Sequence, residues 1–101
     1  MKTFLNLTAA VLFSSIASVS FAGDAAAGKA KSMTCAGCHG TTGISNNPMW
    51  PNLAGQKQAY LASSLQMYRD GRRKNAMMSA MAKNLTDADI ANLAAYYSSL
   101  K

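Results

Sequence analysis

The short segment Cys35-Ala36-Gly37-Cys38-His39 contains every cysteine and the single histidine of the chain. A four-ligand zinc site needs more Cys and His side chains than this segment offers. A miniprotein stapled by disulfides needs more cysteines, placed further apart. A Ser-His-Asp hydrolase of only 101 residues would have almost no scaffold around its catalytic groups. The chain is therefore restricted to chemistry in which two neighbouring thiols and one imidazole act together.

The spacing of these residues is that of a haem c attachment site. Two intervening residues separate the thiols so that they match the two vinyl groups of one porphyrin, and each thiol can form a thioether bond. The adjacent histidine then lies under the ring and can ligate the iron through a ring nitrogen. We therefore predict one covalently bound haem c, attached through Cys35 and Cys38, with His39 as an iron ligand.

Three other functions of the segment are less favoured. A thioredoxin-like dithiol requires a βαβ context, which the sequence does not predict. A zinc half-site would need further ligands from another chain. A disulfide between Cys35 and Cys38 would close a small strained loop and would leave His39 without a role.

The first 22 residues have the features of an export signal. Lys2 precedes an apolar stretch, and small residues occupy the two positions that a signal peptidase reads in Ser20-Phe21-Ala22. The continuous apolar core, Ala9 to Phe13, is much shorter than the roughly 20 residues that span a bilayer. We predict a cleaved signal peptide over residues 1–22, a single domain over residues 23–101 without a membrane span, and a periplasmic location.

The predicted mature chain has little material for a core of its own. Removal of 22 of the 101 residues leaves 79, and all three phenylalanines go with the signal peptide. Trp50 and four tyrosines are the remaining aromatic residues, and the formal charge falls from +6 to +5 because one lysine is lost. Chains of this length rarely build a stable core unaided. We therefore expect a bound group to fill the interior.

The mature sequence predicts helices joined by two loops. Asp24 is a candidate N-cap for a first helix, and residues 56–69 have apolar residues at helical spacing, ended by Asp70-Gly71. Thr86 precedes a last helix, with Asp89 at the third position of a capping box. Residues 40–55 and most of residues 72–83 are predicted as loops. No alternating strand pattern occurs, so the expected fold class is all-α.

Taken together, these motifs resemble those of the class I cytochromes c, and most closely the small bacterial c4, c5 and c553-type proteins. The resemblance covers essentially all mature residues, and its landmarks include the following segments: Gly23–Lys29, Cys35–Gly40, Pro51–Gln56, Met78–Met81 and Leu85–Ile90. It implies a small fold of helices packed around one haem c. It also implies that the first and last helices cross at Gly28, and that Tyr96 and Tyr97 pack in the core.

A second iron ligand must come from elsewhere in the chain, and a methionine thioether is the favoured donor because no other histidine is present. Met33 is too close to the attachment site to reach the other face of the ring, and Met67 falls in a predicted helix, where core packing is its expected role. The resemblance implies Met78, which precedes a serine and stands three residues before Met81. Met81 and Met77 remain alternatives.

The resemblance also implies a partner for the second ring nitrogen of His39. A ligating histidine needs an acceptor for its other N–H, which orients the ring. That acceptor is the backbone carbonyl of Pro51, with Pro48 as the alternative. Asn75 is either a hydrogen-bond donor near the methionine sulfur or an ordinary turn residue, which is the more favoured role.

These features predict a soluble periplasmic electron carrier that transfers one electron at a time, and not an enzyme. The alternatives are a haem subunit docked permanently to a larger oxidoreductase, and a haem enzyme or gas sensor with an open sixth iron position. We expect a monomer that meets redox protein partners, and no nucleic-acid binding. The basic run Arg72-Arg73-Lys74 either attracts acidic partners or only aids solubility.

Overall fold

The computed structural model describes residues 23–101, so the predicted signal peptide lies outside the described residues. These residues form helices, turns and loops without a strand, as expected for an all-α domain. The helical elements are α1 (Ala25–Lys31), the 3₁₀ turn η1 (Ser32–Thr34), α2 (Ala36–His39), α3 (Gln58–Asp70), α4 (Ala76–Ala82) and α5 (Asp87–Ser99). Within this part of the chain, no helix is long and apolar enough to cross a membrane.

The predicted ends of the three main helices are confirmed. Asp24 caps α1, and its carboxylate accepts hydrogen bonds from the first backbone N–H groups of that helix. Helix α3 ends at Gly71, which has the left-handed φ of 78° that favours glycine. Thr86 and Asp89 form a complete capping box at the start of α5, with both reciprocal bonds at 3.0 Å.

Helix α4 was not expected, because most of residues 72–83 was predicted to be a loop. The backbone of Asn75 is extended, and its side-chain oxygen accepts from the N–H of Met77 at 3.1 Å and of Met78 at 3.0 Å. These bonds cap a run of alanine and methionine, both of which are good helix formers. The loop prediction was therefore wrong over α4, and the oxygen of Asn75 serves as a helix cap.

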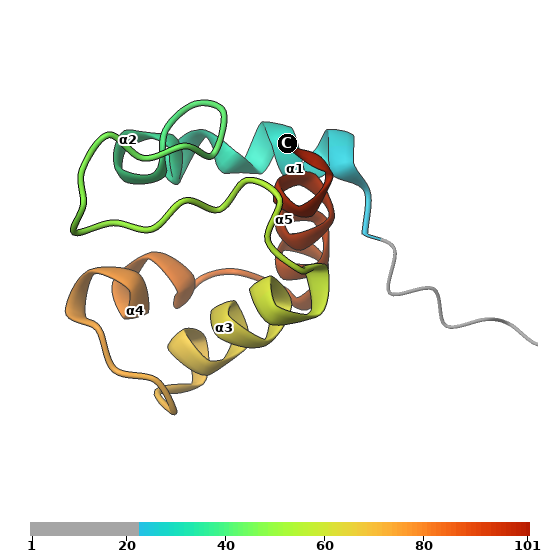
Figure 1. The fold of residues 1–101 in the computed structure, drawn as a ribbon. Helices are drawn as coiled ribbons and strands as arrows, with labels where there is room; N and C mark the ends of the chain where they lie inside the picture. Colours follow the sequence, from blue (N-terminus) through green and yellow to red (C-terminus); the bar gives the residue numbers. More distant parts are fainter. Residues whose placement is uncertain (1–22) are drawn as a thin grey trace, which may run out of the picture.

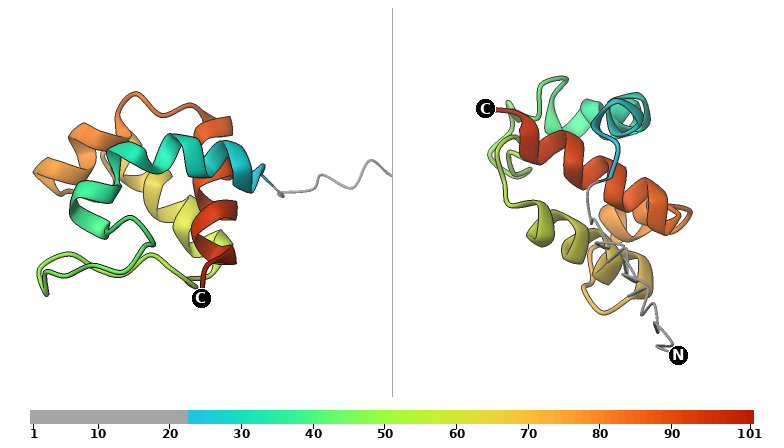
Figure 2. Two further views of the ribbon diagram at one scale, coloured as in Figure 1. Left: turned by 90° about the horizontal axis from the view of Figure 1, so that it is seen from above. Right: turned by 90° about the vertical axis from the view of Figure 1, so that its right-hand side faces the viewer.

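The helices form two layers joined by α5 (Figure 1). One layer contains α1, η1, α2 and the long loop that follows α2, and the other contains α3 and α4. Seen from above, α2 and α4 overlap at the same side of the molecule, so that they lie one over the other in separate layers (Figure 2). The residues of the Cys-x-x-Cys-His segment and the methionines of α4 thus come from facing layers.

The predicted crossing of the first and last helices is present at Gly28. A Cβ atom at this position would overlap the backbone carbonyl of Asn92 and would lie 2.8 Å from the Cβ of Tyr96. Glycine is therefore required here by the close approach of α1 and α5, and not by an unusual φ. The crossing holds α1, and with it the attached α2, against the most buried helix of the domain.

The buried core is small and lies between α3 and α5. Its cluster is built from the following residues: Leu61, Leu93, Ala94, Tyr96 and Tyr97. The two tyrosines are buried, as expected for core packing. Helix α4, in contrast, buries only Ala82. The polypeptide alone thus packs α5 firmly and gives α4 few apolar contacts.

Candidate haem-attachment site

Helix α2 presents the two cysteines and the histidine on a single turn. The carbonyl of Cys35 accepts backbone hydrogen bonds from Cys38 at 3.2 Å and from His39 at 2.9 Å. Both thiols are free and half-buried, so they are not joined in a disulfide. Burial raises the pKa of the Cys35 thiol, which also packs against the core cluster. The geometry therefore leaves two neighbouring thiols available for thioether bonds.

His39 is held in one orientation by Pro51. The ring is only 7% exposed, and its Nδ1–H donates to the backbone carbonyl of Pro51 at 2.8 Å. Pro51, and not the alternative Pro48, is the acceptor. Because Nδ1 carries the proton in this bond, the lone pair of the neutral ring lies on Nε2. The arrangement leaves Nε2 as the donor atom that a metal requires.

Hydrogen bonds made by Gly43, Asn52 and Gly55 hold the loop that contains Pro51. The carbonyl of Gly43 accepts from the N–H of Leu53 at 2.8 Å and of Ala54 at 3.0 Å, which folds the loop back on itself. The side chain of Asn52 accepts from the N–H of Ser45 at 2.7 Å. Farther along, the N–H of Gly55 donates to the carbonyl of Tyr97 at 2.9 Å and ties the loop to α5.

Gly43 and Asn52 were not identified as site residues from the sequence. Gly43 has a positive φ of 75°, and a Cβ there would lie 2.9 Å from the backbone nitrogen of Ala54. A glycine in a loop and an asparagine after a proline do signal a turn. They do not reveal which distant residues the turn brings together.

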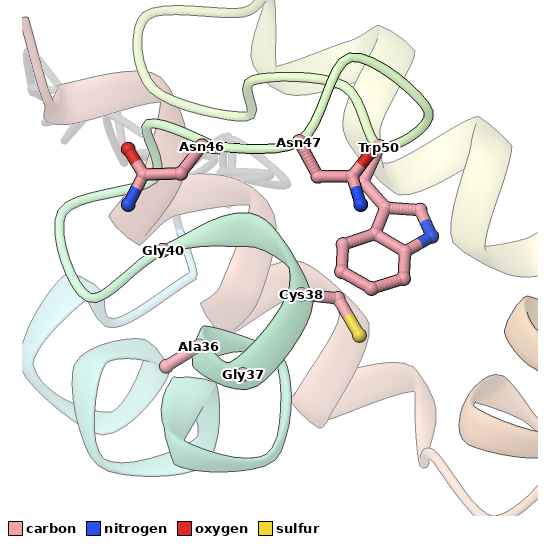
Figure 3. A pocket seen from close by; sticks show the side chains of 7 residues that line it. All are labelled: Ala36, Gly37, Cys38, Gly40, Asn46, Asn47 and Trp50. Atoms are coloured by element: carbon pink, nitrogen blue, oxygen red, sulfur yellow. The ribbon is translucent and has the colours of Figure 1, made fainter.

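A small pocket of about 120 Å³ lies beside α2, lined by Ala36, Gly37, Cys38, Gly40, Asn46, Asn47 and Trp50. Figure 3 shows the Cys38 thiol and the indole of Trp50 on the same side of this pocket. Pockets for small molecules usually measure about 300 to 1,000 Å³. This pocket is therefore too small to be a cofactor site by itself, and it places an aromatic ring near one attachment thiol.

The three candidate methionine ligands all lie on α4. Met78 is half-buried, whereas the side chains of Met77 and Met81 are 55% and 49% exposed. Two thiols can bond the vinyl groups of a haem, and an imidazole nitrogen and a methionine sulfur are suitable ligands for its iron. The residues present thus fit the group. The choice of Met78 over its neighbours stays a prediction.

The basic run after α3 is partly occupied by contacts within the domain. Arg72 pairs with Asp70 at 3.2 Å. The guanidinium of Arg73 lies 4.7 Å above the ring of Tyr68 and donates to Ser64 at 3.5 Å. Lys74 is exposed. Two of the three cations are therefore held against the molecular surface and do not extend freely into solvent.

Comparisons with known proteins agree with this site. Residues 25–101 match the cytochrome c family. Cytochrome c-554(548) of Halomonas halodenitrificans is 57% identical over 81 residues, which are 77% of this chain and 98% of that protein.

Two solved structures are also similar. Reduced cytochrome c4 from Pseudomonas stutzeri superposes with a TM-score of 0.75 at 42% identity, over 79% of this chain and 47% of that one. Thiosulfate dehydrogenase from Marichromatium purpuratum gives a TM-score of 0.74 at 36% identity, over 78% of this chain and 20% of that one. The chain therefore belongs to the cytochrome c family, with the class I fold, a covalently bound haem c and the role of an electron carrier.

Proposed function

We propose that this cytochrome c is a soluble periplasmic carrier that exchanges single electrons with redox proteins and catalyses no reaction of its own. In the proposal, Cys35 and Cys38 would form the two thioether bonds, and His39 and Met78 would ligate the iron. The haem iron supplies the chemistry, a one-electron change between the ferrous and ferric states. Residues 1–22 act as the signal that exports the chain.

The observation that carries the proposal is the hydrogen bond between His39 and Pro51. It fixes the tautomer and the orientation of the imidazole, and it directs Nε2 away from the loop that holds Nδ1. An imidazole held in this way would not have to reorient when the iron changes between its ferrous and ferric states. The polypeptide thus provides a ligand of constant geometry, which suits electron transfer with little rearrangement.

Helix α4 supports the second half of the proposal. It carries Met78 in the layer that faces α2, and Asn75 caps the helix at the N–H of Met78 itself. Two strong axial ligands would leave no open position for a substrate, which is why the proposal excludes an enzyme or a gas sensor. Met81 lies one turn further along the same helix and is the alternative ligand.

Spectra of the purified protein test this proposal. We expect the visible spectrum of a low-spin haem c in both oxidation states, and a weak near-infrared band in the ferric protein from a methionine–iron bond. Carbon monoxide added to the reduced protein should cause no prompt spectral change. A prompt change would show an open sixth position, and the proposal of a simple carrier would then be wrong.

A permanently docked haem subunit is the second candidate function. It is favoured by the match to thiosulfate dehydrogenase, in which the similar region makes up only 20% of a longer chain. The size of the native protein separates the two candidates, because a free carrier elutes as a monomer of the mature chain. Elution of all the haem with a larger oxidoreductase would support the docked subunit.

A further inference from the structure

Arg69, near the C-terminal end of α3, makes polar contacts with the connection between α4 and α5. Its Nη1 donates to the backbone carbonyl of Leu85 at 3.2 Å and to the carboxylate of Asp87 at 2.7 Å. Its Nε donates to the neighbouring Asp70 at 3.3 Å. The side chain of Arg69 is 23% exposed and that of Asp87 is 86% exposed, so the bond to the Leu85 carbonyl is the one partly shielded from water.

These contacts close a loop in the chain. Residues 71–84, here called the methionine segment, leave α3 directly after Arg69 and Asp70. The chain then returns at Leu85 to the side chain of the same arginine. Bonds between residues 69 and 85 and between residues 69 and 87 thus join the two ends of the segment that contains α4.

The methionine segment is held at its start, where Arg73 contacts Tyr68 and Ser64, but helix α4 within it has few buried contacts. Of the residues in α4, only Ala82 is buried, and Met77 and Met81 are largely exposed. Segments with few buried apolar contacts open locally at low cost in free energy. A partly shielded, charge-assisted bond to a backbone carbonyl is stronger than an ordinary neutral one. The closure at Arg69 therefore restrains the end of this segment, as the contacts of Arg73 restrain its start.

We propose that Arg69 is a positioning residue that keeps the methionine segment closed and so holds its methionine on the iron. This inference rests on the proposed function, in which Met78 is the sixth ligand. Arg69 acts through the Leu85 carbonyl and Asp87. Loss of its contacts raises the population of an open segment and makes the methionine easier to displace.

The experiment is a titration of the ferric holoprotein with imidazole, followed by loss of the near-infrared methionine band. An external ligand that binds only the open form gains apparent affinity in proportion to the population of that form. We expect half-displacement at about tenfold lower imidazole in Arg69→Met than in the parent protein, which corresponds to about 1.4 kcal/mol. Arg69→Lys, which keeps the charge but not the forked donor, should fall between the two.

Two control variants separate this effect from general damage. Arg72→Met removes a neighbouring cation that pairs with Asp70, and Asp24→Ala removes the cap of α1 on the other layer. Both should keep the half-displacement concentration of the parent within about twofold. If Arg69→Met does not fold, Arg69→Lys alone decides, since parent-like imidazole affinity in that variant would contradict the proposal.

The outcomes distinguish this inference from the function on which it rests. A parent protein without the near-infrared band would show that methionine ligation itself is wrong, and both proposals would fall. A parent with the band, and an Arg69→Met variant with unchanged imidazole affinity, would overturn only the role of Arg69. An equal gain in affinity in Arg72→Met or Asp24→Ala would overturn it as well.

Discussion

The imidazole Nδ1 of His39 lies 2.8 Å from the carbonyl oxygen of Pro51, a residue twelve positions further along the chain. This bond connects α2 to the loop that follows it. The loop is in turn tied to α5 through the bond between Gly55 and the Tyr97 carbonyl. The orientation of the His39 ring therefore depends on how α2, the loop after it and α5 pack together, and not on α2 alone.

Met78→Ala should abolish the near-infrared band of the ferric protein, because the proposed methionine–iron bond is lost. Met81→Ala is the matched control, one turn along α4, and should retain the band. Both variants keep the Asn75 cap and the alanine-rich sequence of the helix. A band that persists in Met78→Ala and disappears in Met81→Ala would transfer the ligand assignment to Met81.

Replacing both Cys35 and Cys38 by alanine should leave the mature chain largely unfolded. The buried hydrophobic core consists of only a few residues, of which Ile90 and Leu93 are the largest fully buried side chains. Such a core is too small to offset the conformational entropy of the chain without the attached group. Circular dichroism during a thermal melt measures the helix content of the double variant and shows whether it unfolds cooperatively.

Single replacements of Cys35 or Cys38 are the control for the double variant. Each keeps one thioether bond, so haem stays attached and the helices form, with a lower melting temperature than the parent. A cooperative melt with native-like helix content in the double variant would show that the polypeptide folds by itself. The haem would then not be needed to complete the hydrophobic core.

Gly28→Ala should destabilise the protein by about 3 kcal/mol, because overpacking forces the backbones of two helices apart. The new Cβ would overlap the Asn92 carbonyl in α5. Gly37→Ala is the control, since a Cβ at Gly37 meets nothing within 4 Å. Denaturant unfolding of both variants measures the difference. Similar midpoints for the two would mean that α1 and α5 do not cross as closely as described.

Asp89→Asn should remove part of the acid sensitivity of the protein. The backbone N–H of Thr86, with help from Lys31, holds the pKa of Asp89 below its ordinary value. A carboxylate with a lowered folded pKa stabilises the protein above its ordinary pKa, near pH 4, and this contribution disappears as the pH falls through the folded value.

The measurement for this prediction is the free energy of unfolding as a function of pH. At neutral pH the Asp89→Asn variant should be less stable by about 0.5 kcal/mol, the usual contribution of a carboxylate in the first turn of a helix. Between about pH 4 and pH 2 the gap between the parent and the variant should close, because the parent loses its carboxylate. Parallel curves through this range would contradict the role of Asp89.

Local signals in the sequence identified α1, α3 and α5, whereas the short helix α2 was not predicted. Asp24, Thr86 with Asp89, and Gly71 act within a few residues of the backbone groups that they cap, so their effect is readable from the sequence. Helix α4 was missed because its basic and methionine-rich surroundings suggested a loop. The Asn75 cap and the helix propensity of the following residues stabilise a helix there.

The sequence by itself determined the chemistry of this protein. Two thiols and an imidazole at this spacing are typical of a haem c attachment site, because the match is between neighbouring atoms. Tertiary structure decided what lies far apart in the chain: the bond of Gly55 to the Tyr97 carbonyl, and the return of Leu85 to Arg69. Such contacts depend on how whole helices pack, which no local pattern of residues encodes.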